Sequence, residues 1–421
     1  MLLNKKLNEN YIFLILYFTL LIGFYLNEDF NGGAIQDWRS YENTITKFSV
    51  NFYEALMTYD TFGDRHSPFI HIVFSFLKKL GLSFSSIRFL NLHLMLLIIF
   101  FFYQCLKLKF KNVEKKYLKA LVALIFLSTT FRSLSIWPDS RLYGILFFIL
   151  SLKYFLLFQY QNKPNDFTNA SINTFFLAIS SYFSPNFAVF SIYFFYHFFL
   201  RFKISSKIFY IVFINIILAL PAFYYIFYLD INFLIQPGTP GATGSFKFGS
   251  PEFNFANKII IISSIFFFYL LPIIIKQNLF ELNKKSLSFF LILGFPIFLL
   301  CIYSFDYKLE YSGGGIFFIA SNLFLKNNIF FFTISFFAIY YVFFKNFKFN
   351  NTFLFFLIII SNIQLTIYHK YYDPMILILS FTILDFNIKE KFFNYINILN
   401  FYYLYLFFLC AKTLKKILFF F

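Results

Sequence analysis

Long apolar runs are the feature that most constrains what this chain can fold into. Runs of about 16 to 25 apolar residues recur from one end of the 421-residue sequence to the other. Such lengths are typical of helices that cross the hydrocarbon core of a membrane. Because every backbone polar group in lipid has to pair within the protein, these runs predict helices rather than open sheet. We therefore expect an all-α polytopic membrane protein, a single transmembrane domain over 1–421 with about 11 to 13 transmembrane helices.

The positive charge of the chain has a membrane explanation. The formal net charge is +17, and much of it comes from lysines in short turns between apolar runs, as at 107–119 and 276–285. Cytoplasmic loops of membrane proteins carry this excess of basic residues. No basic patch interleaved with aromatics lies on a soluble segment, so nucleic acid is not an expected partner. The charge pattern predicts the plasma (inner) membrane, with these lysines on its cytoplasmic side.

The same charge rule predicts which segments lie outside. The run at 11–26 has no small-residue cleavage site after it and is read as an uncleaved first helix that starts in the cytoplasm. The segments 27–68, 230–257 and 305–328 then become outer, or periplasmic, loops. The run at 68–80 is short and ends in two lysines, so we expect an interfacial or re-entrant helix rather than a crossing. Near the C-terminus, a span is expected at 352–368.

The first outer segment inverts the charge of the rest of the chain. Between residues 27 and 72 there are seven acidic side chains and three basic ones. Carboxylates held near a membrane are costly and are often functional. A transferase that attaches a sugar to a hydroxyl needs one carboxylate as a general base. Asp37, ten residues after the first apolar run, is the candidate, and a solvated loop aspartate is the alternative.

Short motifs in this part of the chain resemble those of a known family. They are Asp37-Trp38-Arg39-Ser40-Tyr41, Asp64-Arg65-His66-Ser67-Pro68, Gly81 with Ser86-Ile87-Arg88, and Ser140-Arg141-Leu142-Tyr143. Together they resemble the GT-C glycosyltransferases, among them the dolichyl-phosphate-mannose protein mannosyltransferases and the bacterial lipid-A and O-antigen sugar transferases. The turn His369-Lys370-Tyr371-Tyr372-Asp373-Pro374 is similar to an aromatic-proline turn of that family. The resemblance covers residues 1–160, and the remainder only by hydropathy.

The resemblance implies roles for individual residues. It implies that Asp37 is the catalytic base and that the site binds a polyprenyl-phosphate-linked sugar and a glycan, lipid or protein acceptor. The substrate-binding residues that it suggests are Asp64, His66, Arg88, Arg141, Tyr143, His369, Lys370 and Tyr372. For Asp64 a helix N-cap is an equal alternative, because Pro68 is placed to open a helix.

Three cations are candidates for the phosphate of such a lipid donor. Arg88, Arg141 and Lys370 are all expected at outer ends of helices, and arginine binds phosphate through two parallel hydrogen bonds. The alternative is that these long side chains reach to the membrane interface and bind nothing. Gly313, Gly314 and Gly315 offer backbone amides to a phosphate, but a flexible loop is the favoured interpretation.

No cofactor is predicted from the sequence, and the requirement for a divalent metal is left open. The family's acidic pair is replaced here by Asp37-Trp38, and His-Pro-Pro by His66-Ser67-Pro68, which weakens a metal site in this segment. The function expected is a membrane glycosyltransferase. The alternatives are a polysaccharide flippase or transporter, whose broken helices and mid-helix charges are weak here, and an O-antigen polymerase or ligase.

Overall fold

The computed structural model describes residues 9–30, 33–62, 67–161, 163–229, 254–276, 284–311, 313–345, 348–362 and 364–419. Within these ranges every regular element is a helix, and one isolated backbone bridge joins Gly313 to Ile367. The α-helices of the first half are α1 (Glu9–Tyr25), α2 (Ala34–Val50), α3 (Phe52–Met57), α4 (Phe69–Lys79), α5 (Phe84–Leu94), α6 (Leu96–Lys109), α7 (Lys115–Ala123), α8 (Thr129–Ile136), α9 (Ser140–Tyr160), α10 (Asp166–Phe183) and α11 (Phe190–Phe202). Those of the second half are α12 (Ser206–Phe223), α13 (Phe255–Lys276), α14 (Lys284–Phe289), α15 (Phe295–Tyr303), α16 (Gly315–Leu325), α17 (Ile329–Ile339), α18 (Phe349–Ser361), α19 (Met375–Phe381) and α20 (Tyr395–Phe419).

Five helices in the described residues are long and apolar enough to cross a membrane. They are Phe84–Lys109, Ser140–Tyr160, Ser206–Tyr228, Phe255–Lys276 and Lys284–Tyr303. A sixth span is formed if Lys115–Leu127 and Thr129–Ile136, which meet at an angle of 65°, are counted as one. The chain is thus an all-α protein with the helices of a membrane protein, as the apolar runs predict.

The expected count of 11 to 13 spans is not reached by this measure. Four further apolar helices in the described residues have only 10 to 17 residues, at Asn10–Tyr25, Gly315–Leu325, Ile329–Lys345 and Phe349–Ser361. An α-helix rises about 1.5 Å per residue and needs about 20 residues to cross the hydrocarbon core. Within the described residues, these four apolar helices are therefore shorter than a full span.

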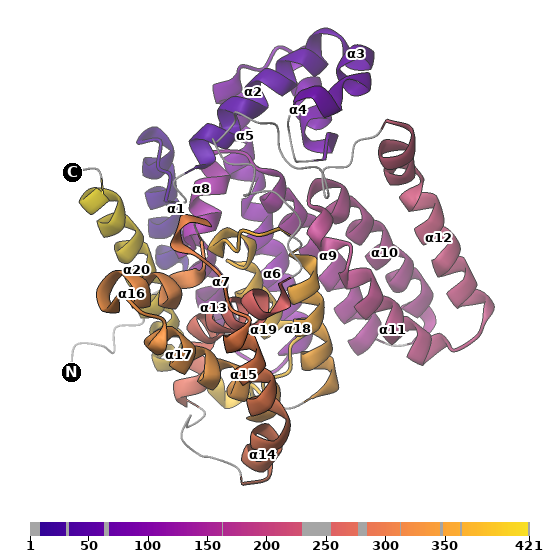
Figure 1. The fold of residues 1–421 in the computed structure, drawn as a ribbon. Helices are drawn as coiled ribbons and strands as arrows, with labels where there is room; N and C mark the ends of the chain where they lie inside the picture. The colour runs from indigo at the N-terminus through magenta and orange to yellow at the C-terminus, as the bar shows by residue number, and fades with distance from the viewer. Residues whose placement is uncertain are drawn as a thin grey trace.

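The segment that was expected to form the first outer loop is largely helical. Residues 27–68 contain α2, α3 and the 3-10 turn η1 (Tyr59–Phe62), and α2 packs against α4 at one end of the molecule (Figure 1). The residues of α2 that are buried recur at helical spacing: Ala34, Trp38, Tyr41, Thr44, Ile45 and Phe48. This amphipathic pattern explains why a polar segment folds as a helix against the bundle. α4 has only 11 residues, which agrees with the expectation that it does not cross.

The core of the bundle forms around α13. Nearly all of α13 is buried, and it packs against α16, α17, α18, α19 and α20 (Figure 1). On the other side of the molecule, α9 and α10 form a second close pair, with α12 beside α10. α12 buries only Ile208 and Ile211. Its exposed face is apolar, as expected of a helix that faces lipid.

The C-terminal third departs from the predicted boundaries. The span expected at 352–368 ends at Ser361, where the side chain of Asn362 accepts a hydrogen bond from the Gln364 amide (3.2 Å) and so turns the chain. The chain then runs inward through the 3-10 turn η9 (His369–Tyr371) to α19. The expected outer loop at 305–328 likewise contains the helix α16.

The glycine triplet before α16 joins the backbone to this C-terminal segment. Gly314 donates its amide to the Ile367 carbonyl (2.9 Å), and Gly313 has φ +76°. A Cβ atom on Gly313 would lie 2.5 Å from that carbonyl oxygen, so only glycine fits. This close approach, rather than a phosphate, is what the triplet serves in the structure.

Candidate functional site

Two of the predicted site residues form an ion pair. Lys370 Nζ lies 3.3 Å from Asp37 Oδ2, although the two residues are 333 positions apart in the sequence. Asp37 lies in the first turn of α2 and Lys370 in η9. The first turn of a helix favours a negative charge, since the backbone amides there have no partner within the helix. The side chains of Lys370 and Asp37 are 24% and 40% exposed, so the pair is open to solvent on one side.

A second carboxylate acts on Lys370. Burial opposes its charge, but the carboxylates of Asp37 and Asp139 outweigh burial and raise the pKa of Lys370 above its usual value. Lys370 is therefore an ammonium at any physiological pH. Asp139 itself is buried at the start of α9, where its side chain accepts a hydrogen bond from the Arg141 amide (2.6 Å). The sequence analysis missed Asp139, although its place after Pro138 in a polar turn between two apolar runs was a usable signal.

Arg141 is close to this site but faces the protein. It is 6% exposed and donates hydrogen bonds to the Tyr371 carbonyl and to Ser184 Oγ (3.3 Å). Its guanidinium also lies over the ring of Phe187, 4.6 Å from the centroid. These contacts join α9 to the turn that carries Lys370. In this conformation Arg141 holds the turn that carries Lys370, and its own side chain is buried.

Arg88 is held by contacts of its own with the protein. Its guanidinium stacks on Trp137, 3.4 Å from the ring centroid, and donates to the Ile136 carbonyl (3.1 Å) and to Asn27 Oδ1 (3.0 Å). The side chain is only partly buried. The stacking and hydrogen bonds fix Arg88 between the end of α1 and the end of α8, so the geometry favours a structural role.

The remaining described candidates are interior side chains. His369 accepts the Ile316 amide at Nε2 (3.1 Å) and bonds through Nδ1 to the Tyr269 hydroxyl (3.3 Å), so its neutral form suits both partners. Burial and, to a smaller extent, the charge of Lys412 lower the pKa of His369 to about 3. Tyr372 is 1% exposed and its hydroxyl accepts from Asn362 Nδ2 (3.2 Å). As placed, both side chains hold the turn together and neither faces a ligand.

Tyr143 has the same character. It is 6% exposed and its ring stacks on Phe183, with 5.1 Å between the centroids, and meets Phe74 edge-on at 5.7 Å. Its packing links α9, α10 and α4 below the Asp37 helix. The last two candidates, Asp64 and His66, lie outside the described residues.

The sequence analysis overlooked a second ion pair, which joins Arg132 of α8 to Glu28 after α1. Arg132 Nε and Nη2 lie 2.5 Å and 2.6 Å from the two carboxylate oxygens of Glu28. Arg132 also donates to the hydroxyl and the carbonyl of Thr19, each at 3.0 Å. The signal was Arg132 itself, an isolated charge in the apolar run at 117–136. Such a charge in a membrane helix needs a partner.

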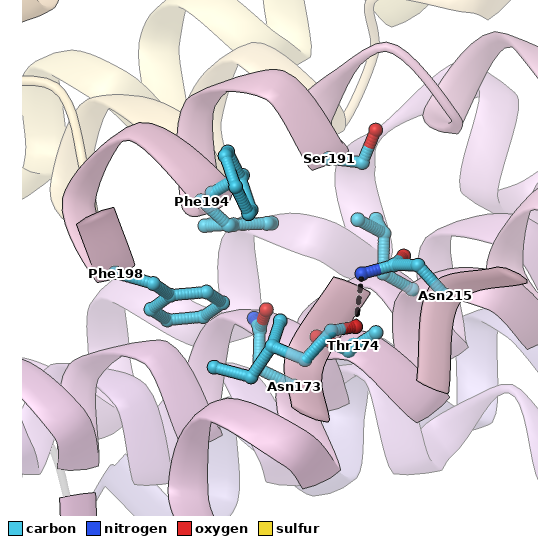
Figure 2. A pocket seen from close by; sticks show the side chains of 9 residues that line it. Asn173, Thr174, Ser191, Phe194, Phe198 and Asn215 are labelled. Carbon is cyan, nitrogen blue, oxygen red and sulfur yellow. Dashed lines mark hydrogen bonds between the residues drawn. The ribbon is translucent and has the colours of Figure 1, made fainter. Parts of the chain in front are cut away.

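The described residues contain no group of three or more His, Cys, Asp or Glu side chains that could hold a metal ion. A small cavity lies elsewhere in the described residues, among α10, α11 and α12. Its lining includes Asn173, Thr174, Ser191, Phe194, Phe198 and Asn215 (Figure 2). It has room for about one water molecule, too little for a sugar or a lipid phosphate. The site with chemical groups in place is the open Asp37–Lys370 pair.

That pair combines a carboxylate able to accept a proton with an ammonium able to bind an anion. Asp139 adds a second negative charge that acts on Lys370. Comparison with known proteins adds nothing to this geometry: no family model, curated protein or solved structure matches the chain. The proposed function therefore rests on the arrangement of Asp37, Lys370 and Asp139, together with the apolar helices and the sequence resemblance.

Proposed function

We propose that the chain is a membrane glycosyltransferase that moves a sugar from a polyprenyl-phosphate donor to a glycan, lipid or protein acceptor on the outer face of the membrane. The observation that carries the proposal is the 3.3 Å pairing of Asp37 with Lys370. Two residues singled out for different parts of one reaction, proton removal and phosphate binding, meet at a half-exposed site. The apolar helices around them provide the surface along which a polyprenyl tail would lie.

Lys370 is the group proposed to bind the donor phosphate. An ammonium binds phosphate as a point charge, and Lys370 remains charged because of Asp37 and Asp139. When the phosphate pairs with Lys370, Asp37 loses its partner and becomes available as a base. Arg141, which donates to the Tyr371 carbonyl, holds the Lys370 turn in position. This assigns the two cations different tasks.

The proposed reaction is a single displacement. The acceptor hydroxyl oxygen attacks the anomeric carbon, and Asp37 takes the hydroxyl proton as the new carbon–oxygen bond forms. The bond between the anomeric carbon and the phosphate oxygen breaks with inversion, and its electron pair leaves with the lipid phosphate. Lys370 stabilises the additional negative charge on that phosphate. The products are the glycosylated acceptor, the polyprenyl phosphate and a protonated Asp37.

The donor separates this proposal from cytoplasmic sugar transfer. The purified protein in lipid nanodiscs should transfer sugar from a polyprenyl-phosphate sugar and none from a nucleotide sugar. Lys370→Gln should weaken the use of the lipid donor, seen as a higher KM for it. Lys326→Gln changes a surface lysine at the end of α16 and serves as the matched control. Efficient transfer from a nucleotide sugar without added lipid would overturn the proposal.

The outer position of the site is proposed from charge and is open to direct test. Thr46 on α2 and Lys115 at the start of α7 both have exposed side chains, and both lie in polar stretches of the sequence. In intact cells carrying one cysteine at a time, an impermeant maleimide should label Thr46→Cys and leave Lys115→Cys unlabelled. The reverse pattern would place the Asp37 helix on the cytoplasmic side.

A transporter of lipid-linked sugar is the second candidate, and one observation favours it. The span made of Lys115–Leu127 and Thr129–Ile136 is broken and bent by 65°. Interrupted helices of this kind line the substrate sites of many transporters. The test is whether reconstituted vesicles move a labelled lipid-linked sugar between leaflets when no acceptor is present. Movement without transfer, unaffected by Asp37→Asn, would favour this function over the first.

A further inference from the structure

The break in the bent span is occupied by a carboxylate from another part of the chain. The 3-10 turn η2 (Leu124–Leu127) ends at Ser128, and α8 starts at Thr129 in a new direction. Asp373, which follows η9, places its Oδ2 atom at this break. Ser128 donates its hydroxyl to Oδ2 (2.6 Å) and Thr130 donates its amide (3.3 Å). Asp373 thereby caps the first turn of α8.

The second oxygen of the same carboxylate is in a different situation. Asp373 is 1% exposed, and its Oδ1 atom is buried without a hydrogen-bond partner among the described residues. An ionised carboxylate whose second oxygen is buried and has no donor is strongly disfavoured. Within the described residues, Oδ1 therefore has no hydrogen-bond donor that would stabilise a negative charge on it.

The groups that face Asp373 come from three directions. Tyr269 of α13 and Tyr405 of α20 both lie within electrostatic range of its carboxylate, and Lys412 of α20 is the nearby cation. Tyr269 bonds to His369, whereas the Tyr405 hydroxyl is buried and has no hydrogen-bond partner within the described part of the chain. Ser128 and Thr130, the two donors at the break, do not titrate. Among the described residues, the groups that shift the pKa of Asp373 include no second carboxylate.

From this geometry we propose that Asp373 is a proton-binding site at the break of the bent span, and that the proton is taken up on Oδ1. The proton converts the buried carboxylate to a neutral acid, while Oδ2 keeps its bonds to Ser128 and Thr130. The site is distinct from the Asp37–Lys370 pair, because the Asp373 side chain is buried and the Asp37 side chain is 40% exposed. Protonation of Asp373 acts on the break between η2 and α8, because the carboxylate is hydrogen-bonded to Ser128 and Thr130 there.

The electrostatics of the pocket support a titration near neutral pH. Burial raises the pKa of Asp373 to about 6, against the opposing effects of the bonds from Ser128 and Thr130 and the charge of Lys412. An aspartate in the unfolded chain titrates near ~4. The folded protein therefore binds the proton more tightly than the unfolded chain does. The stability that Asp373 contributes is present below about pH 4 and is lost as the pH rises through about 6.

The direct measurement is infrared spectroscopy of the full-length protein in nanodiscs as a function of pH. The carbonyl band of a protonated, buried carboxylic acid should be present at pH 5, decline with a midpoint near pH 6 and be absent at pH 8. Asp373→Asn should lack this titrating band. Glu310→Gln, at an exposed carboxylate in the turn before α16, should retain it. Because the titration is made on the unsubstituted protein, the result stands even if Asp373→Asn folds poorly.

Thermal unfolding provides the second readout. The melting temperature of the unsubstituted protein minus that of Asp373→Asn should decrease as the pH is raised from 5 to 8. The reason is that Asp373 loses its proton over this range, whereas asparagine has none to lose. Absence of a protonated band at pH 5 would contradict the proposal. A melting midpoint at pH 8 that rises with sodium chloride but not with choline chloride, and only when Asp373 is present, would also overturn it in favour of a sodium site.

Discussion

Two ion pairs connect the N-terminal polar segment to the rest of this protein, and they differ in every physical respect. Glu28 and Arg132 make two charged contacts of 2.5 Å and 2.6 Å, and their side chains are 14% and 6% exposed. Asp37 and Lys370 make one contact of 3.3 Å and are 40% and 24% exposed. The first pair is also tied to Thr19 by two hydrogen bonds.

The difference in exposure and bonding indicates a structural role for the first pair and suits the second pair to catalysis. The Glu28–Arg132 pair is desolvated and fully bonded, so removal of either partner leaves a buried charge alone. The Asp37–Lys370 pair is weak and open to solvent. Either side chain can therefore exchange its partner for a different charged group with a small change in free energy. A catalytic base and an anion-binding cation have to make that exchange in every turnover. The predictions below test whether the two pairs behave in these opposite ways.

The largest effect is expected from Asp37→Asn. The amide keeps the shape of the side chain but cannot act as a base, so transfer to the acceptor should fall by roughly 10²–10⁴-fold. The amount of protein in the membrane should not change. Transfer from a polyprenyl-phosphate sugar by purified protein measures the effect.

The matched control for that substitution is Glu54→Gln. Glu54 is an exposed carboxylate on α3, a short helix of the same polar segment, where it accepts a hydrogen bond from Asn51 Nδ2 (3.0 Å). It should keep near-normal activity. Equal losses in both variants, or full activity in Asp37→Asn, would show that the base is a different residue.

The buried pair should respond in stability instead. Arg132→Met leaves Glu28 buried and unpaired, which costs about 3–5 kcal/mol of the free energy of unfolding. The double variant Glu28→Gln with Arg132→Met removes both charges and should recover a large part of that loss. Thermal unfolding of the purified protein compares the two. If the single variant is as stable as the double, the pair is not desolvated as the structure has it.

The smallest effect is expected from the open pair in the same assay. Lys370→Met should change the free energy of unfolding by about 0–1 kcal/mol, since exposed ion pairs contribute little. Its loss of activity should therefore occur in a folded protein. A loss of stability comparable to that of Arg132→Met would mean that Lys370 is a structural residue.

The long apolar runs of the sequence predicted the five full-length apolar helices of the described residues. The apolar runs correspond to α5 with α6, α9, α12, α13 and α14 with α15, because burial in lipid requires long uninterrupted helices. The apolar run at 117–136 is long enough to form one span, but the structure bends it by 65° at Ser128. Ser128 is a local signal for this break, because its side chain caps α8 by accepting the Phe131 amide (2.9 Å). Its bond to Asp373, 245 residues away, could not be read from the sequence.

The site was predictable only in its chemistry. Asp37 and Lys370 were both singled out by residue type and position, but their contact joins α2 to η9 across 333 residues, and no local pattern encodes it. The same separation explains the residues that turned out to be interior. His369, Tyr372 and Arg141 were expected at an outer surface, and the inward turn after Ser361 buries them. That turn depends on the Gly313–Ile367 bridge, which is formed by tertiary contact.

The central claim is that Lys370 exchanges Asp37 for the phosphate of the donor, and binding of a polyprenyl phosphate tests it most directly. The dissociation constant should be measured by calorimetry for the unsubstituted protein, Asp37→Asn and Lys370→Gln in nanodiscs. Asp37→Asn removes the competitor of the phosphate, so it should bind the lipid at least as tightly as the unsubstituted protein while it fails to transfer sugar. Lys370→Gln should bind it more weakly. Equal weakening in both variants would contradict the exchange and make the pair a structural contact.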